Sequence, residues 1–94
     1  MACAKGLKQV SLELGGKSAA VVLDDADPAT VAGAIQSASL ANSGQVCNAL
    51  SRVLVPAARQ NEFVDALDAG MESMTVGDPA DPATQLGPLV AQRQ

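Results

Sequence analysis

The sequence contains no histidine. This absence excludes catalytic systems in which an imidazole deprotonates a serine or cysteine, and it excludes metal sites with histidine ligands. Phe63 is the single aromatic residue, so small aliphatic side chains must fill any core. Cysteine occurs only at Cys3 and Cys47, and two distant thiols without histidine predict neither a zinc site nor a disulfide-rich secreted scaffold.

Positive charge is also scarce. Six lysines and arginines oppose ten aspartates and glutamates, which gives a formal net charge of −4. No basic stripe is available to bind phosphate groups, so neither nucleic acid nor an anionic membrane is expected as a partner. The apolar runs are far shorter than the roughly 20 residues of a membrane span. The opening residues also lack the continuous apolar stretch of a signal peptide, and we therefore expect a cytoplasmic protein.

The composition is nevertheless that of a folded protein. Hydrophobic residues make up 48% and charged residues 17% of the 94 residues, which is typical of globular rather than disordered chains. The length corresponds to one small domain or to part of a larger one. Such a chain buries only about 60–65% of the surface that it exposes when unfolded, so an independent core is marginal.

The first half of the sequence predicts two strands and a helix. Residues 10–14 alternate between apolar and polar, which indicates a strand, and the Gly15-Gly16 pair that ends it can approach another backbone closely. Residues 19–23 form a continuous apolar run, as in a strand buried on both faces of a parallel sheet. Asp27-Pro28 is a helix start, because aspartate accepts amide hydrogen bonds at the N-cap. Apolar residues follow at helical spacing, namely Val31, Ala34, Ile35, Ala38 and Ala41.

The second half continues the alternation of strands and helices. Residues 52–55 predict a strand, which a proline ends, and residues 59–74 predict a helix. Residues 90–94 indicate the start of another helix, and residues 1–7 are typical of the end of one. Strands separated by helices imply crossover connections, so we expect an α/β fold with parallel strands. The apolar side of the second predicted helix consists of Phe63, Val64, Leu67, Met71 and Met74.

Three short motifs are candidates for chemistry. Gly16-Lys17-Ser18 has the end of a phosphate-binding loop, but Ser11 stands where that loop needs a glycine, so a strand-end turn is the better interpretation. Cys47 lies in a loop of small polar residues whose amides could stabilise a thiolate, although composition alone favours a buried, inert thiol. Glu13 is either a solvent-exposed residue of an edge strand or a base in an apolar pocket. Considered alone, the exposed position is favoured.

A series of motifs also runs through the chain in a distinct order. They are Leu-Glu-Leu-Gly-Gly-Lys at 12–17, Asp-Asp-Ala-Asp at 24–27, Asn-Ser-Gly-Gln-Val-Cys at 42–47, Ser-Arg at 51–52, Val-Gly-Asp-Pro at 76–79 and Leu-Gly-Pro-Leu at 86–89. Together they resemble the aldehyde dehydrogenase superfamily over nearly the whole chain. The glutamate signature and the cysteine signature of that family are both present, in the right order and at the family's spacing.

The resemblance implies a role for five residues. Cys47 would be the nucleophile that attacks a small-molecule aldehyde and then carries a thioester, and Glu13 would be the general base that activates the hydrolytic water. Leu14, Gly15 and Gly16 would lie at the nicotinamide of NAD or NADP, where the glycines have no side chain to clash with it. No metal is implied, and the mechanism needs no histidine.

The resemblance further implies that the chain is an internal slice of an aldehyde dehydrogenase. Residues 1–14 would be the end of a Rossmann-like cofactor-binding domain, with 10–14 as its last strand, and residues 15–94 would be the first part of the catalytic domain. An alternative is a truncated, inactive fragment that acts only as an interaction module. Such a fragment would form homo-oligomers or aggregates through exposed strand edges. A third interpretation is an acidic α/β interaction module without enzymatic activity.

Overall fold

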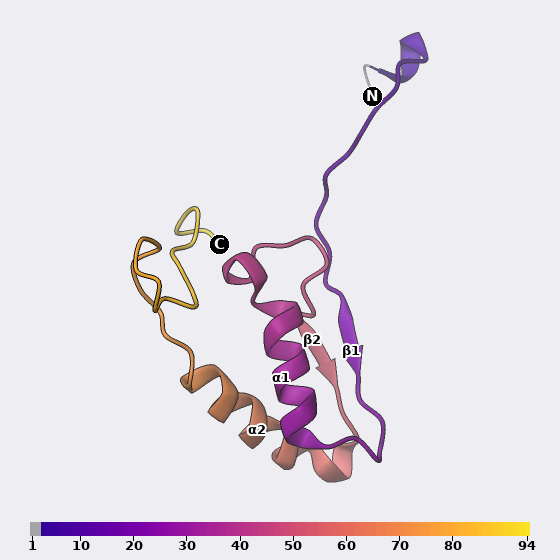
Figure 1. Ribbon diagram of the computed structural model, residues 1–94. Helices are drawn as coiled ribbons and strands as arrows, with labels where there is room; N and C mark the ends of the chain where they lie inside the picture. Colours follow the sequence, from indigo (N-terminus) through magenta and orange to yellow (C-terminus); the bar gives the residue numbers. More distant parts are fainter. Residues whose placement is uncertain (1–2) are drawn as a thin grey trace.

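Two short parallel strands and the helix that connects them form the centre of the molecule, of which the computed structural model describes residues 3–94. Strand β1 (Ala19–Val21) pairs in parallel with β2 (Arg52–Leu54). Helix α1 (Pro28–Ser39) crosses over between them, and α2 (Gln60–Glu72) follows β2 and packs against α1 (Figure 1). This arrangement confirms the expected α/β fold with parallel strands. Three short 3-10 helices complete the regular structure, namely η1 (Ala4–Gly6), η2 (Ala41–Gly44) and η3 (Ala57–Arg59).

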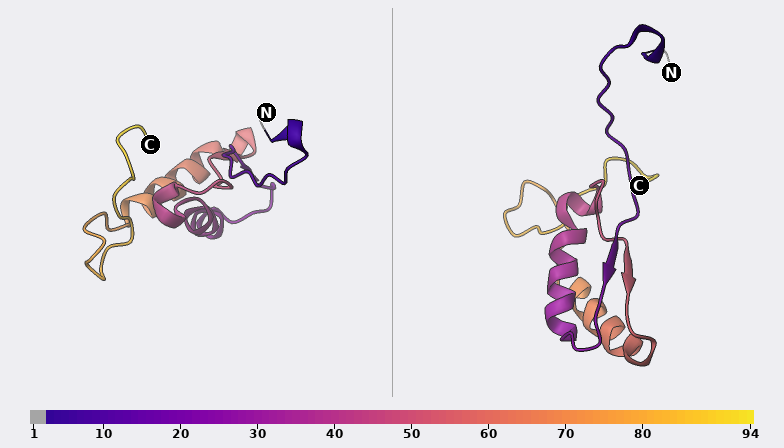
Figure 2. Two further views of the ribbon diagram at one scale, coloured as in Figure 1. Left: turned by 90° about the horizontal axis from the view of Figure 1, so that it is seen from above. Right: turned by 90° about the vertical axis from the view of Figure 1, so that its right-hand side faces the viewer.

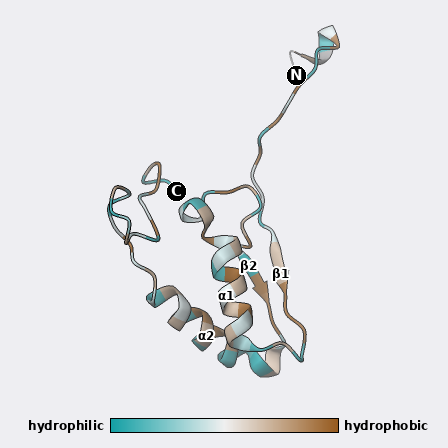
Figure 3. Cartoon of the chain, viewed as in Figure 1, coloured by the Kyte–Doolittle hydropathy of each residue, from teal (hydrophilic) through white to brown (hydrophobic). Residues whose placement is uncertain are grey.

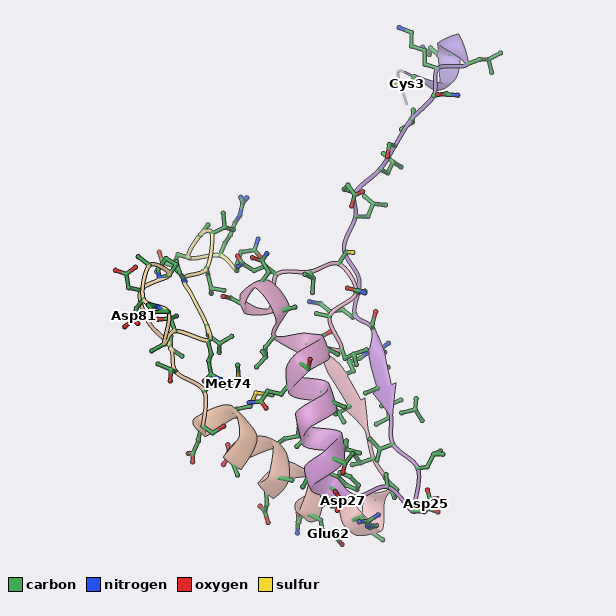
Figure 4. The ribbon with its side chains drawn as sticks, viewed as in Figure 1. Cys3, Asp25, Asp27, Glu62, Met74 and Asp81 are labelled. Atoms are coloured by element: carbon green, nitrogen blue, oxygen red, sulfur yellow. The ribbon has the colours of Figure 1, made fainter. Side chains whose placement is uncertain are left out.

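Helix α1 begins where the sequence predicted, at the Asp27-Pro28 pair. Asp27 lies at the start of α1 (Figure 4). Its carboxylate accepts a hydrogen bond from the Thr30 hydroxyl at 2.7 Å and another from the Thr30 amide at 2.8 Å. These two bonds, and to a lesser degree the positive charge of Arg59, hold the pKa of Asp27 below its ordinary value. Pro28 occupies the first turn, where the missing amide hydrogen costs nothing. The cap therefore fixes the start of the crossover helix.

A small core lies between α1 and α2. Phe63 of α2 is only 1% exposed, and Ala32 and Ile35 of α1 are buried with it. Beside this contact, the side-chain amide of Gln36 donates a 2.6 Å hydrogen bond to the Gly70 carbonyl and ties the two helices together. These three are the buried hydrophobic residues of the described part of the chain, and the single aromatic ring is the largest side chain among them.

Arg59 fastens the start of α2 to the loop between β1 and α1. Its guanidinium donates to the backbone carbonyls of Asp24 at 2.6 Å and Ala26 at 2.9 Å. The same group pairs with Glu62 at 2.9 Å and lies 4.9 Å from the centroid of the Phe63 ring. One arginine therefore connects the loop, the helix start and the core at the end of the molecule where both helices begin.

Residues 10–14, which the sequence predicts as a strand, do not form one. The segment is irregular, and its apolar residues Val10, Leu12 and Leu14 are 56%, 69% and 71% exposed. A strand needs a neighbour that accepts and donates its backbone hydrogen bonds, and no segment within residues 3–94 pairs with this one. The alternation of apolar and polar residues at 10–14 therefore does not produce a strand in this structure, because the described part of the chain holds no neighbouring strand to pair with it.

The apolar run at residues 19–23 forms a strand, but the prediction that both its faces are buried is wrong. Val21 and Leu23 are 70% and 67% exposed. Burial on both faces requires covering layers on both sides, whereas helices cover only one side of this two-stranded sheet (Figure 2). Figure 3 shows the consequence, since hydrophobic residues lie along β2 and in the segment that follows β1.

The predicted helices need smaller corrections. On α1, Ala34 and Ala38 are exposed and Ala32 is buried, because α2 packs on a neighbouring face of the helix. Residues 90–94 form turns and bends instead of a helix. The helix end expected at residues 1–7 is represented by the single turn of η1, and the first two residues lie outside the described part.

The molecule is elongated. Its radius of gyration is 17.5 Å, whereas a compact domain of this length has about 12 Å. The segment before β1 extends away from the body, and the segment after α2 forms irregular loops held by an isolated bridge between Val76 and Leu86 (Figures 1 and 2). Within residues 3–94, no helix is both long enough and apolar enough to span a membrane.

The cap of α1 leads to a prediction about pH. A carboxylate whose pKa is lowered by folding stabilises the fold above its unfolded pKa of about 4, and this contribution is lost as the pH falls through the lowered folded value. Asparagine also caps helices but does not titrate. We therefore expect the acid-induced loss of helicity, measured by circular dichroism, to be smaller in Asp27→Asn than in the unaltered chain.

Thr30→Val provides the matched control, because it removes the hydroxyl that donates to Asp27 and keeps the shape of the side chain. In this variant the loss of helicity should begin at a higher pH than in the unaltered chain. Identical acid curves for all three chains would show that the Asp27 cap does not contribute to the pH dependence.

Candidate active site

An open cleft of about 780 Å3 lies where three distant segments of the chain meet. The first segment precedes β1, the second runs from η2 toward β2, and the third lies near the end of the described chain. The parallel pairing explains the first two, because the residues that enter two parallel strands lie at the same end of the sheet. The lining residues are Leu14, Gly15, Gly16, Lys17, Asn42, Gly44, Gln45, Val46, Cys47, Pro88, Leu89, Val90 and Gln94.

Cys47 lies in this cleft as an exposed, free thiol. The loop that carries it is tightened by two backbone hydrogen bonds, from the Ala49 amide to the Val46 carbonyl at 3.2 Å and from the Ser51 amide to the Ala49 carbonyl at 2.9 Å. The thiol therefore lies in an exposed loop, and the burial that the composition favours for Cys47 is wrong. Cys3 is also free and exposed, so no disulfide joins the two cysteines.

Gly16 brings the segment before β1 against the cysteine loop. A Cβ atom at this position would lie 3.1 Å from the backbone carbonyl oxygen of Cys47, which is closer than almost all real Cβ contacts. At Gly15, by contrast, a Cβ would meet nothing within 4 Å. Arg52 secures the approach, since its side chain donates to the Lys17 carbonyl at 2.9 Å. The close backbone approach predicted for the glycine pair is thus confirmed at Gly16.

The turn before Cys47 has an unusual backbone. Asn42 and Ser43 have φ values of 52° and 57°, and Gly44 has a φ of 78°, so three consecutive residues adopt the left-handed conformation. This conformation costs a residue with a side chain roughly 1–2 kcal/mol, although asparagine tolerates it better than most. The reversal of direction between α1 and the cysteine loop depends on it. The sequence signal for this turn is its run of asparagine, serine and glycine, residue types that favour turns.

The phosphate-loop and metal interpretations have no support in the structure. Gly16-Lys17-Ser18 leads into strand β1, whereas a phosphate-binding loop leads into the N-terminus of a helix whose amides hold the anion. Among the residues that the structure describes, no three histidine, cysteine, aspartate or glutamate residues gather into a group that could hold a metal ion. The groups that line the cleft include a thiol, backbone amides and a small number of polar side chains.

The comparison with known families explains why these features occur together. The sequence profile of the Aldehyde dehydrogenase family matches residues 1–94, which is the whole chain. The chain belongs to the aldehyde dehydrogenase family.

Individual relatives agree with this assignment. Geranial dehydrogenase of Castellaniella defragrans is 46% identical over 90 residues, which cover 96% of this chain and 19% of that protein. A mutant of aldehyde dehydrogenase C from Pseudomonas syringae, solved with NAD+ and octanal, superposes with a TM-score of 0.89 and 36% identity. 3,6-Anhydro-L-galactose dehydrogenase, solved with NADP, gives a TM-score of 0.87 and 39% identity. Each of these two structures covers 98% of this chain, but the chain spans only about one fifth of its relatives' length.

Membership in the aldehyde dehydrogenase family confirms the resemblance drawn from the glutamate and cysteine motifs. It also supports the use of a nicotinamide cofactor in this family, since the solved relatives are cofactor complexes. Of the five predicted site residues, the structure brings four into one cleft, namely Leu14, Gly15, Gly16 and Cys47. Their individual roles stay predictions.

Glu13 is the predicted site residue that the structure does not bring into the cleft. It is exposed, and the lining begins with the next residue, Leu14. Because residues 10–14 have no strand partner here, the backbone does not fix the direction in which the Glu13 side chain points. The sequence reasoning also missed the third wall of the cleft, which includes Pro88, Leu89 and Val90.

The close approach at Gly16 leads to a prediction with a built-in control. In Gly16→Ala the new methyl group must push the Cys47 carbonyl away by a few tenths of an ångström. In Gly15→Ala the methyl group enters open space. We expect the backbone amide resonances of Cys47 and Asn48 in nitrogen–proton NMR spectra to shift clearly in Gly16→Ala and to stay near their original positions in Gly15→Ala. Equal shifts in the two variants would contradict the close approach.

Proposed function

We propose that this chain supplies the nucleophile and the general base of an NAD(P)-dependent aldehyde dehydrogenase, which oxidises an aldehyde to a carboxylic acid. The observation that carries the proposal is the exposed Cys47 thiol in a cleft that Gly15 and Gly16 also line. The family match over the whole chain supports the same roles. Since the relatives are about five times longer, we assign the activity to the complete enzyme and not to these residues alone.

Cys47 is the nucleophile of the first step, the attack on the aldehyde. Its thiolate attacks the carbonyl carbon of the aldehyde, a carbon–sulfur bond forms, and the carbonyl electron pair moves to oxygen. An N–H group aimed at this oxygen stabilises the negative charge that develops there. Within residues 3–94, the Cys47 amide donates a hydrogen bond to no other group, so it is free to serve as such a donor.

The cofactor side of the cleft consists of residues that leave room for a flat ring. A Cβ would meet nothing at Gly15, and a volume of about 780 Å3 lies within the usual range of small-molecule sites. Leu14, Gly15 and Gly16 would therefore contact the nicotinamide. When bound, NAD(P) accepts the hydride that leaves the former aldehyde carbon, so that a thioester on Cys47 results.

Glu13 would act as the general base in the hydrolysis of the thioester. Its carboxylate accepts a proton from water, the water oxygen attacks the thioester carbonyl, and the carbon–sulfur bond breaks to release the acid and restore the thiol. This role requires the carboxylate to point into the cleft that begins at Leu14. We expect residues 10–14 to pair with further strands in the complete enzyme, which would fix the direction of the side chain.

A chimaera tests these roles in a complete enzyme. Residues 1–94 would replace the matching segment of the Castellaniella defragrans geranial dehydrogenase, and formation of reduced nicotinamide would be measured with geranial and NAD+. We expect Cys47→Ala to lower kcat about a thousandfold or more, because it removes the bond-forming atom. Cys3→Ala should retain activity, since Cys3 does not line the cleft. Retained turnover in Cys47→Ala would overturn the proposal.

The Glu13→Gln form of the same chimaera separates oxidation from hydrolysis. Without the base, the enzyme should release about one equivalent of reduced nicotinamide in a burst and then slow down, because the thioester accumulates. Mass spectrometry should find the acyl group on Cys47. Unchanged steady-state turnover in Glu13→Gln would contradict the role of this residue as the base.

A second proposal concerns the chain by itself. An apolar groove of about 360 Å3 lies over β2 and α2, and the two-stranded sheet has unpaired edges. Exposed edges and apolar grooves favour association with a further copy. We propose that the isolated chain forms oligomers and does not turn over aldehyde. The groove is lined by Val53, Leu54, Val55, Gln60, Phe63, Val64 and Leu67.

Light scattering over a range of concentrations tests the association. The apparent mass of the chain should rise with concentration, and Val64→Lys should reduce the rise, because Val64 lines the groove and is 52% exposed. Val76→Lys is the matched control, since Val76 is 73% exposed and does not line the groove. A monomer at every concentration would refute the association.

A further inference from the structure

Gln45, two residues before Cys47, connects two walls of the cleft. Its side-chain oxygen accepts a 2.8 Å hydrogen bond from the backbone amide of Val90. Its side-chain nitrogen donates a 3.0 Å hydrogen bond to the Asn42 carbonyl, at the start of the left-handed turn. One side chain thus joins the turn that leads to the nucleophile with a segment 45 residues further along the chain.

A second hydrogen bond supports the same connection. The hydroxyl of Ser43 donates to the Gly87 carbonyl at 3.1 Å. Within the turn, the side-chain amide of Asn42 donates back to the Gln45 carbonyl at 3.3 Å, so Asn42 and Gln45 bond reciprocally. The strained turn and the segment at residues 87–90 are therefore held by side chains alone, since no backbone ladder joins them.

The position of the 88–90 wall depends on these few contacts. Residues 88–94 form no helix or strand, and Leu89 and Val90 are 50% and 80% exposed. Burial therefore contributes little to holding the wall, and the hydrogen bond that the Val90 amide donates to the Gln45 side chain gains importance. Without it, the Ser43 bond is the one hydrogen bond that remains between residues 87–90 and residues 42–47.

We propose that Gln45 is a positioning residue that holds the 88–90 wall against the cysteine loop and thereby limits the size of the electrophile that reaches Cys47. This inference rests on the proposed function, because the cleft is taken as the place where Cys47 meets its substrate. Gln45 touches neither the reacting carbon nor the sulfur. It acts through Val90 on one side and through the turn at Asn42 on the other.

The experiment compares alkylation of Cys47 by a small reagent, iodoacetamide, and by a bulky maleimide, with Cys3 in the same chain as an internal reference. Both thiols are free and exposed, but only Cys47 lines the cleft. In the unaltered chain, the bulky reagent should be disfavoured at Cys47 relative to Cys3. In Gln45→Met this size selectivity should fall to that of Cys3, because the wall is no longer held.

Hydrogen exchange of the Val90 amide reports the contact directly. Loss of its acceptor in Gln45→Met should speed exchange about two- to tenfold, whereas the Leu86 amide, which bonds to the Thr75 carbonyl, should not change. Gln45→Glu keeps an oxygen for Val90 but loses the donor to the Asn42 carbonyl, so it should restore the protection of the Val90 amide and part of the size selectivity. This rescue also keeps the test valid where Gln45→Met disturbs the fold.

Gln85→Met is the matched control. Gln85 makes an equivalent contact, since its side-chain oxygen accepts from the Thr75 amide at 2.9 Å, but it does not line the cleft. A change of size selectivity in Gln85→Met, or none in Gln45→Met, would overturn the proposal. So would faster Val90 exchange with unchanged selectivity, or an unaltered chain without size selectivity at Cys47.

Failure of this inference can be told apart from failure of the proposed function. The positioning role is judged by the ratio of bulky to small reagent, which does not depend on how reactive the thiol is. The proposed function is judged by the geranial-dependent turnover of the chimaera and its loss in Cys47→Ala. If the chimaera is active but Cys47 shows no size selectivity, the proposed function stands and the positioning role of Gln45 is refuted.

Discussion

The parallel pairing of β1 and β2 is the constraint on which the rest of this structure depends. Parallel strands need a crossover, which α1 provides, and the pairing places the residues before both strands at the same end of the sheet. Gly16 and the Cys47 loop therefore meet although helix α1 separates them in the sequence. Ligands of open α/β sheets usually bind at the carboxyl ends of the strands, whereas this cleft lies where the strands begin.

The approach at Gly16 is possible because there is no side chain between the two backbones. A hydrogen bond from the Arg52 side chain to the Lys17 carbonyl then holds the leading segment in place, and the left-handed turn at residues 42–44 aims the loop back toward it. The cleft is thus formed by backbone geometry and single side-chain contacts more than by burial. This suits the proposed function, in which the cleft admits an aldehyde and a nicotinamide cofactor, but it leaves the walls dependent on residues such as Gln45.

Several features could be predicted from the sequence because their causes are local. The Asp27-Pro28 pair specifies a helix start through its own hydrogen bonds, and the α2 helix follows from the spacing of its apolar residues. The site could be predicted in part because motifs around Cys47 and Gly16 identify the family. The strand at residues 10–14 and the position of the Glu13 carboxylate could not, because each depends on a neighbouring strand that residues 3–94 do not supply.

The sequence by itself determined helices α1 and α2, strands β1 and β2 and the family, and it pointed to the Cys47 thiol as the candidate nucleophile, since these follow from side-chain chemistry and spacing along the chain. Only the tertiary structure decided that the thiol is exposed and which face of α1 is buried. It also decided that a wall from residues 88–90 lies beside the cysteine loop. These features arise from contacts between segments far apart in the chain, and no local pattern records which distant segment will supply the partner.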